Sequence, residues 1–435
     1  MKILRFSEII LAVLLSALMI ISPVSDISAQ GISDDCLKEY AEGIVKYEKS
    51  VSGIPAEDSL FSGKFLEYAG RDSADWFVIG ASRMGLDEDY ESYYYAFAEN
   101  LSENEDDLKA TDWQRYTLTA LSCGGDPEDI NGINAPKKGV YGGENPGRQG
   151  LNGWIWALIA LDSYGFETPE NGSIDRDRII NEIISSQLPD GGFALGGDAG
   201  DCDLTAMAVQ ALSVHTKERE DVKDSVEKAL DFLSRQLSEK DFENCETVAQ
   251  TLCALCCADI NYGSDERFTA DGNLLESLLE YRNADGGFSH IKGEDSDPLA
   301  SSQALLALAA VYRYENGMCG LYYFSGDFTP RTYTFDKAPS DENQREINAI
   351  NAEIMQGLYP FEKLDGEQKK RLEELYERTL KLPESDREKI TGYEKMKEIC
   401  ESKLSARTII SAVSLLIITA LATILRIKRY KGEKK

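Results

Sequence analysis

Positive charge is scarce in this sequence. Only 46 Lys and Arg residues stand against 76 Asp and Glu residues, which gives a formal net charge of −30 over 435 residues. A surface of that sign repels phosphates and gains nothing from the release of their counterions. We therefore exclude nucleic acid as a partner. Most of this acidity is explained by the solubility that an exported domain needs.

Complete metal-ligand patterns are also lacking. The nine cysteines are an odd number, so they cannot form a closed set of disulfides within one chain. Cys253, Cys256 and Cys257 are spaced to share one face of a helix, but no second Cys-x-x-Cys supplies further ligands. We expect no metal and no other cofactor. Buried thiols and some disulfides both remain open, as does their pairing.

The first long apolar run lies near the N-terminus. Lys2 and Arg5 precede an apolar run at 9–21, and small residues follow up to Ala29. This three-part layout is typical of a secretory signal peptide, which we place at residues 1–29. As a helix the run would extend only about 20 Å, too short for the roughly 30 Å hydrocarbon core of a membrane.

The second long apolar run lies near the C-terminus. Residues 408–425 carry no charge, and a strongly basic tail follows them. We predict a transmembrane helix at 405–426 and a cytoplasmic tail at 427–435; a buried core helix is the alternative. No Leu-Pro-x-Thr-Gly sorting pattern precedes the helix. The sequence thus predicts a single-pass protein of the cell membrane, with its N-terminal domain extracellular and its C-terminus cytoplasmic.

The region between the two ends is built from a repeat. Asp-Gly-Gly-Phe occurs twice, ending at Phe193 and Phe288, and a degenerate copy ends at Phe242. Apolar runs that close on Ala-Leu follow these turns, and weaker copies begin at Asp75 and Asp112. The pattern predicts six helical hairpins between residues 36 and 317. Such hairpins form either an open solenoid or a closed ring, an all-α (α/α)6 toroid.

The repeat stops after residue 317. Residues 318–341 are rich in aromatic residues and threonine, and we predict a short extended linker there. Residues 342–404 are charged, with apolar stripes at helical spacing and two capping-box patterns, Asp365 to Gln368 and Ser385 to Glu388. We interpret them as a small helical stalk that sets the ring off from the membrane.

Two stretches carry a family resemblance. Residues 187–193, with Gln-x-x-Asp-Gly-Gly-Phe, and residues 201–206, Asp-Cys-Asp-Leu-Thr-Ala, resemble the terpenoid cyclase and protein prenyltransferase superfamily, which contains the prenyltransferase and squalene oxidase repeat. The ring is also similar to those of cobalamin carriers and of bacterial surface proteins. The resemblance implies an α/α toroid, but a fold does not by itself confer an activity.

Three chemistries of such toroids can be compared with this sequence. In cyclases of this superfamily, the catalytic acid belongs to an Asp-x-Asp-Asp motif. The resemblance aligns this motif with Asp201 and Asp203 of the present sequence, but Leu204 stands at the position of the last aspartate. Both acids are therefore weak catalytic candidates. The zinc ligands of prenyltransferases align with Asp203, Thr205 and Ala300, so two of three are missing. The thioester string Gly-Cys-Gly-Glu-Gln does not occur. The chain's two histidines are His215 and His290, and we interpret His290 as a solvated loop residue.

What remains is a ligand-binding wall at one mouth of the ring. Aromatic and acidic residues fall near the starts of the predicted inner helices, and the candidates are Trp76, Trp113, Trp154, Trp156, Asp203, Glu246 and Asp297. Such a wall suits an amphipathic or cationic guest. The competing interpretation is that the tryptophans fill the ring and the acids cap helices.

We therefore predict a membrane-anchored extracellular toroid that binds a small or extended ligand, an isoprenoid, a corrinoid or a peptide, without catalysis. One alternative is a terpene cyclase-like or prenyltransferase-like enzyme with a degenerate acid motif. Another is a surface scaffold or adhesion module. The oligomeric state stays open.

Overall fold

The computed structural model describes residues 32–401, except 104–107, 144, 171, 241, 243, 270–271, 328, 334–341, 356, 362, 383 and 388. The chain divides into two compact units, residues 1–334 and 335–435. The predicted signal peptide, transmembrane helix and basic tail lie outside the described residues. Among the helices that are described, none combines the length and the apolar character that crossing a membrane requires.

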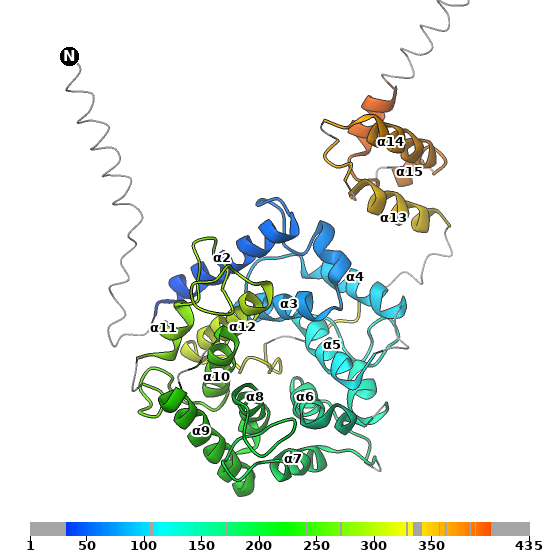
Figure 1. The fold of residues 1–435 in the computed structure, drawn as a ribbon. Helices are drawn as coiled ribbons and strands as arrows, with labels where there is room; N and C mark the ends of the chain where they lie inside the picture. The colour runs from blue at the N-terminus through cyan, green and yellow to red at the C-terminus, as the bar shows by residue number, and fades with distance from the viewer. Residues whose placement is uncertain are drawn as a thin grey trace, which may run out of the picture. The chain divides into compact units, whose positions relative to one another are not determined.

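Six inner helices form the wall of a closed ring in the first unit (Figure 1). They are α3 (Asp72–Met84), α5 (Ala110–Ser122), α6 (Gly150–Asp162), α8 (Cys202–Leu212), α10 (Cys245–Cys257) and α12 (Pro298–Glu315). Each packs against the next, and α12 packs against α3. Their many small residues allow this close approach: in α12, residues 304–311 are all buried and four of them are alanine. The prediction of an all-α toroid is confirmed, and the described residues contain isolated β-bridges but no strand.

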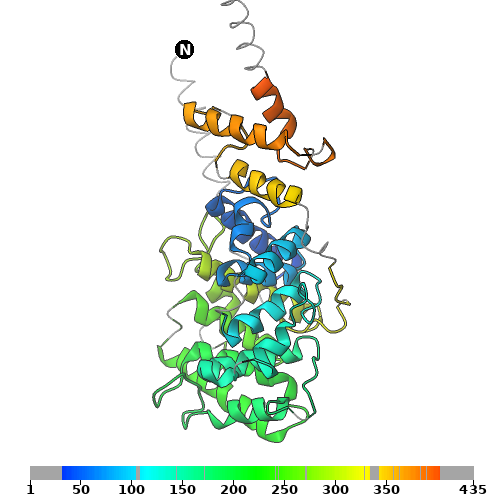
Figure 2. The ribbon, with the colours of Figure 1, turned by 90° about the vertical axis from the view of Figure 1, so that its right-hand side faces the viewer.

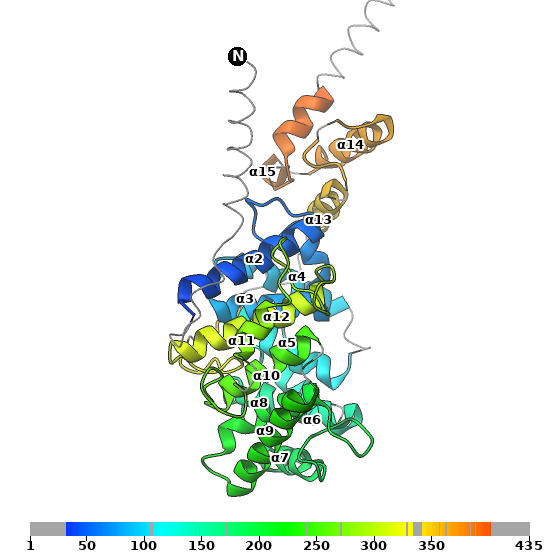
Figure 3. The ribbon, with the colours of Figure 1, turned by 60° about the vertical axis from the view of Figure 1, so that its left-hand side comes forward.

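The outer layer is amphipathic and less regular. Its helices are α2 (Asp34–Ser52), α4 (Tyr90–Glu103), α7 (Arg176–Ser185), α9 (Glu220–Lys240) and α11 (Leu274–Leu279). Helix α2 packs on α12, so the first and last hairpins meet (Figures 1 and 3). The third hairpin differs: before α6 the chain forms only the short helices η3 (Lys137–Tyr141) and η4 (Pro146–Gln149). Glycine and proline, frequent in residues 136–150, disfavour a longer helix there.

The Asp-Gly-Gly-Phe turn fastens the start of an inner helix. Phe193 and Phe288 are fully buried. The backbone N–H of Phe193 donates to Thr205 Oγ1 at 2.8 Å, and that of Phe288 donates to Ser301 Oγ at 2.9 Å. Asp190 accepts hydrogen bonds from the N–H groups of two glycines that border the turn. The repeated sequence is therefore explained by a repeated structural joint.

Replacing Gly286 with alanine is expected to destabilise the ring by about 2–4 kcal/mol. Gly286 has φ +94°, and an added Cβ would lie 2.5 Å from the carbonyl oxygen of Gly43 in α2. Gly293 is the matched control, because its φ is +84° but its Cβ would meet nothing within 4 Å. Gly293→Ala should cost only the backbone strain, about 1 kcal/mol. If urea unfolding showed the same loss of unfolding free energy for Gly286→Ala and Gly293→Ala, the role of the contact with α2 would be refuted.

Residues 318–333, the first part of the predicted linker at 318–341, are hydrogen-bonded to the ring. We call residues 318–333 the closing segment. The N–H of Phe324 donates to the carbonyl of Ser163 at 2.7 Å, and the hydroxyl of Tyr333 donates to the carbonyl of Cys123 at 2.8 Å. Both acceptors follow the C-terminal ends of inner helices. The aromatic side chains, Phe324 among them, are buried on the ring, so this segment packs on the ring as well as leading to the next unit.

The closing segment is held by a buried ionic cluster. Asp327 accepts from Arg83 Nη1 at 2.7 Å and from Arg313 Nη2 at 2.6 Å. The two arginines lie in the last turns of α3 and α12, and both are almost fully buried. Arg83 also donates to the carbonyls of Gly320 and Tyr323. The closing segment thus covers the C-terminal mouth of the ring.

The second unit has its own apolar core. It contains α13 (Glu342–Met355), α14 (Gly366–Thr379) and α15 (Glu384–Arg387), drawn in yellow to orange in Figure 2. Ile350, Leu372 and Met396 are fully buried in this core. The predicted capping box of Asp365 and Gln368 is present at the start of α14. Glu388, the end of the second predicted box, lies outside the described residues.

Candidate functional site

Two tryptophans meet inside the ring. Trp76 belongs to α3 and Trp156 to α6, with α5 between these helices in the wall. Their rings nevertheless lie 5.1 Å apart, and Trp156 also contacts Tyr322 of the closing segment at 5.5 Å. Both tryptophans therefore point into the interior. Tyr322 fills the interior from the C-terminal mouth.

A chain of glutamines continues this inner surface. Gln210 Nε2 donates to Gln250 Oε1 at 2.8 Å, and Gln250 Nε2 donates to Gln303 Oε1 at 2.6 Å. The three residues come from the consecutive helices α8, α10 and α12. Gln303 is partly exposed although residues 300–302 and 304–311 are buried. Trp76, near the start of α3, is partly exposed in the same way, so solvent reaches the interior from the N-terminal mouth.

The other two tryptophans do not join this site. Trp113 packs on Tyr116 at 5.7 Å, and the ammonium of Lys138 lies 5.0 Å from its ring. Trp154 faces Arg178 of α7 at 5.9 Å. Both indoles thus lie between an inner helix and an outer element. The structure brings together only Trp76 and Trp156 of the four candidates.

Two of the candidate acids act as helix caps. The Asp201 carboxylate accepts from the N–H of Leu204 at 2.8 Å, and that of Asp297 accepts from the N–H of Ala300 at 2.9 Å. They are the N-caps of α8 and α12. Both carboxylates are thus used as helix caps, as the competing interpretation of the acids expected.

Asp203 and Glu246 lie at the N-terminal mouth, in the first turns of α8 and α10. Asp203 accepts from the hydroxyl of Thr247 at 2.6 Å, which joins α8 to α10. Burial raises the pKa of Asp203 above its ordinary value. Glu246 lies 2.7 Å from Nδ1 of His290, whose side chain is 54% exposed in the loop before α12. His290 is therefore on the surface as predicted, but it is hydrogen-bonded to a candidate acid.

His290 is expected to titrate above its ordinary pKa of 6.5, because the hydrogen bond with Glu246 favours the imidazolium. This contact stabilises the fold fully below the unfolded pKa and loses its effect as the pH rises through the folded pKa. NMR titration of the imidazole resonances should show a lower midpoint for His290 in Glu246→Gln. His215→Gln, which removes the chain's other histidine, should leave that midpoint unchanged. An unshifted midpoint in Glu246→Gln would contradict the contact.

Asp75 belongs to the wall and not to the mouth. Its fully buried carboxylate accepts from Arg115 Nε at 2.8 Å, the Tyr93 hydroxyl at 2.7 Å and the N–H of Gly70 at 3.1 Å. These bonds tie α3 to α4 and α5. In the sequence, Asp75 marks only the start of a weak repeat copy. Its partner is Arg115, which is 7% exposed, and a charge buried in this way requires a partner.

The described residues hold no group of three or more His, Cys, Asp or Glu side chains that could bind a metal ion. Thr205 aligns with one of the zinc ligands of prenyltransferases. Its hydroxyl instead accepts from the N–H of Phe193 and donates to the carbonyl of Asp201. Burial raises the pKa of the thiols of Cys253, Cys256 and Cys257, which opposes the thiolate that a metal requires.

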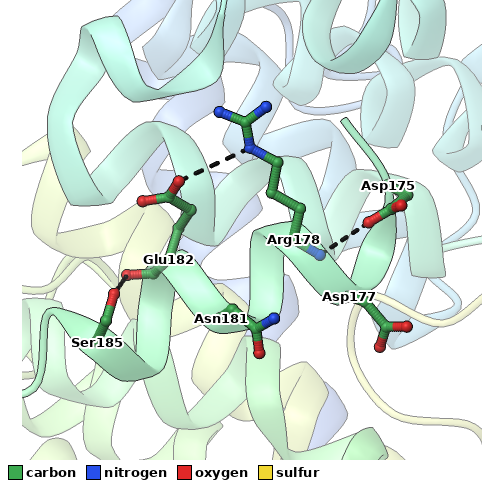
Figure 4. Close-up of a pocket in the computed structure, with 6 residues that line it drawn as sticks. All are labelled: Asp175, Asp177, Arg178, Asn181, Glu182 and Ser185. Carbon is green, nitrogen blue, oxygen red and sulfur yellow. Dashed lines mark hydrogen bonds and ion pairs between the residues drawn. The ribbon is translucent and has the colours of Figure 1, made fainter. Parts of the chain in front are cut away.

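A shallow pocket on the outside of the ring is unrelated to these residues. Figure 4 shows its lining, which comes from α7 and the residue that caps it: Asp175, Asp177, Arg178, Asn181, Glu182 and Ser185. Arg178 pairs with Glu182 at 3.7 Å, and Asp175 accepts from the backbone N–H of Arg178 at 2.8 Å. Asp177 pairs with Arg219 at 3.4 Å. This acidic pocket serves below as a control surface.

The chain is similar to several known proteins. Drimenyl diphosphate synthase from Streptantibioticus cattleyicolor is 30% identical over 139 residues, and that from Streptomyces showdoensis is 28% identical over 133 residues. Each match covers 29% of this chain and 25% of the relative, so the chain spans about a quarter of the length of these relatives. The unsaturated glucuronyl hydrolase from Bacillus sp. GL1, responsible for the degradation of glycosaminoglycan, superimposes with a TM-score of 0.46 at 14% identity, over 68% of this chain and 100% of the hydrolase.

One family model matches the chain directly. It is described as the prenyltransferase alpha-alpha toroid domain, and it covers residues 148–319. This range contains α6, α8, α10 and α12 together with both Asp-Gly-Gly-Phe turns. Residues 148–319 are therefore similar to the prenyltransferase alpha-alpha toroid domain, the resemblance that their repeats predicted.

Proposed function

We propose that the ring is a binding module that takes its guest through the N-terminal mouth. The guest rests on Trp76 and Trp156 and lies below Asp203 and Glu246. The observation that carries this proposal is the contact of Trp76 with Trp156 across the interior, with Trp76 partly exposed. Because the closing segment covers the other mouth, we infer that the guest occupies a cup that opens only at the N-terminal mouth. An apolar floor and a polar rim suit an amphipathic ligand.

We further propose that this module is exported and tethered, with the cleaved signal at residues 1–29, the membrane helix at 405–426 and residues 342–404 as a stalk. The uncharged run at 408–425 and the basic tail support this placement. Protease treatment of intact cells should remove the ring and leave the C-terminal tail protected. Recovery of the intact protein from the soluble fraction would refute the tether.

A second candidate is an enzyme that uses Asp203 as a proton donor. Two observations favour it: burial raises the pKa of Asp203, and the relatives reported above are named drimenyl diphosphate synthases. A general acid must keep its proton near the working pH, which such a shift assists. Asp203→Asn would then abolish turnover of an isoprenoid while leaving the fold intact. Turnover that persists in Asp203→Asn would refute this candidate.

The binding proposal is tested by the ligand that the purified protein retains. Mass spectrometry of retained small molecules and peptides identifies the class, and isothermal titration measures the affinity. Trp76→Leu should weaken binding at least about tenfold, equivalent to about 1.4 kcal/mol. Tyr95→Leu, which removes a 37% exposed aromatic residue from the outer helix α4, should change nothing. Equal affinity in Trp76→Leu and the unaltered protein would refute binding inside the ring.

A further inference from the structure

We propose that the guest is the end of a basic, amphipathic peptide, whose Lys or Arg side chains lie against Asp203 and Glu246 while its apolar side chains rest on the rim. This inference rests on the proposed function, since it names the chemistry of the ligand for the same mouth. It is carried by exposed apolar residues, the charge of the rim and a buried acceptor inside the ring.

Exposed apolar side chains gather at the N-terminal mouth. Leu195 is 71% exposed in the loop before α8, Leu299 is 52% exposed in the first turn of α12, and Ile291 is 37% exposed in the loop before α12. Leu195 also reaches toward Gly150 at the start of α6. Single exposed leucines are ordinary, but three around one mouth form a surface that a partner can cover.

The same rim is acidic on the side formed by α8, α10 and α12. Besides Asp203 and Glu246, the loops that carry Leu195 and Ile291 hold exposed acids, namely Asp198, Glu294 and Asp295. Lys292 of these loops pairs with Glu280 at 2.8 Å, and His290 with Glu246. Across the ring, Lys109 and Arg148 precede α5 and α6. Charge complementarity therefore draws a cationic partner to the α8–α12 side and orients it there.

A buried acceptor lies further along α8. Gln210 is 1% exposed, and its Oε1 has no hydrogen-bond partner among the residues that the structure describes. Its Nε2 donates a hydrogen bond to Gln250, which makes Gln210 the first member of the glutamine chain on the inner surface. Gln210 follows Asp203 by seven residues, about 10 Å along α8. One ammonium group cannot reach both the acids and this acceptor, whereas an extended peptide end presents donors over that depth.

The same features argue against the other ligand classes. An isoprenoid diphosphate that enters this mouth brings its negative charge close to Asp203 and Glu246. Their carboxylates repel the diphosphate. An anionic membrane surface is repelled in the same way. A peptide cation is attracted, and over Trp76 it also gains from the negative face of the indole.

Titration calorimetry with the full-length protein tests this inference. The probe is a twelve-residue peptide of alternating Lys and Leu; the controls are the same peptide with Glu for Lys, the same peptide with Ser for Leu, and spermidine. We expect the Lys-Leu peptide to bind at least about tenfold more tightly than each control, and its affinity to fall when salt is raised from 50 to 300 mM, since screening weakens charge contacts.

Two variants and a matched control locate the contact. Asp203→Asn with Glu246→Gln should weaken the Lys-Leu peptide about tenfold or more, and Leu195→Ser about threefold. Asp177→Asn with Glu182→Gln removes two acids from the outer pocket of Figure 4 and should leave the affinity unchanged. Leu195 is exposed in a loop, so its substitution leaves the fold intact.

Several outcomes would overturn the inference. Equal binding of the Glu-Leu peptide, equal loss in the outer-pocket control, or spermidine binding as tightly as the peptide would each do so. If the peptides fail while an isoprenoid or corrinoid binds in a Trp76-dependent way, the peptide is refuted but the binding function stands. If Trp76→Leu binds every ligand as the unaltered protein does, the proposed function itself fails.

Discussion

Replacing Asp75 with asparagine is expected to lower the free energy of unfolding of the ring by about 3–5 kcal/mol. The Asp75 carboxylate is fully buried, and Arg115, whose side chain is 9% exposed, donates to it at 2.8 Å. Asparagine keeps the size of the side chain but leaves the guanidinium without its buried counterion. Removing one member of a buried ion pair costs far more than the pair contributes, because the remaining charge cannot regain its hydration.

Urea unfolding followed by tryptophan fluorescence measures this loss. All four tryptophans lie in the first unit, so the signal reports on the ring alone. Asp112→Asn is the matched control: Asp112 pairs with the same arginine at 3.3 Å, but its side chain is 24% exposed. That change should cost less than about 1 kcal/mol. Equal losses in the two variants would show that burial of the pair does not determine its importance.

The ring was predictable because its elements repeat. The small residues that let inner helices pack closely, and the turn that fastens each helix start, recur along the sequence and can be aligned with one another. The apolar runs that close on Ala-Leu at Leu212 and Leu255 correspond to α8 and α10. A repeat fixes local contacts between neighbouring hairpins, and those contacts determine most of the ring.

The orientation of the tryptophans was only partly predictable. All four lie near the starts of inner helices, but a helix turns by about 100° per residue, so position alone does not say which face is inside. Trp154 and Trp156 illustrate this point. Being two residues apart they cannot share a face, and in the structure Trp156 enters the ring while Trp154 faces α7.

The closing segment was not predictable from its own sequence. Its aromatic and threonine-rich residues fit an extended linker locally, and its contacts are with residues far away in the chain, such as Ser163 and Arg83. A signal did exist within the repeats. Arg83 and Arg313 are charged residues inside otherwise apolar inner helices, and buried arginines require acceptors. Asp327 and the neighbouring carbonyl groups are those acceptors.

Asp327→Asn is expected to release the closing segment and to destabilise the ring by about 3–5 kcal/mol. The carboxylate is the shared counterion of Arg83 and Arg313, whose side chains are 3% and 5% exposed. Asparagine would leave two buried guanidinium groups facing each other. Burial and, next, the neighbouring charge of Arg313 lower the pKa of Arg83 to about 10, so both arginines depend on the carboxylate of Asp327. Hydrogen exchange should accelerate at residues 318–333 before it does in the inner helices.

Glu91→Gln is the matched control for this prediction. Glu91 pairs with Arg331 of the same segment at 2.9 Å, but the two side chains are 56% and 60% exposed, so the loss should stay below about 1 kcal/mol. Release of the segment in Asp327→Asn also withdraws Tyr322 from Trp156, which should shift tryptophan emission to longer wavelength as water enters the cup from the C-terminal side. Unchanged exchange and emission in Asp327→Asn would show that apolar contacts, and not the ionic cluster, keep the C-terminal mouth covered.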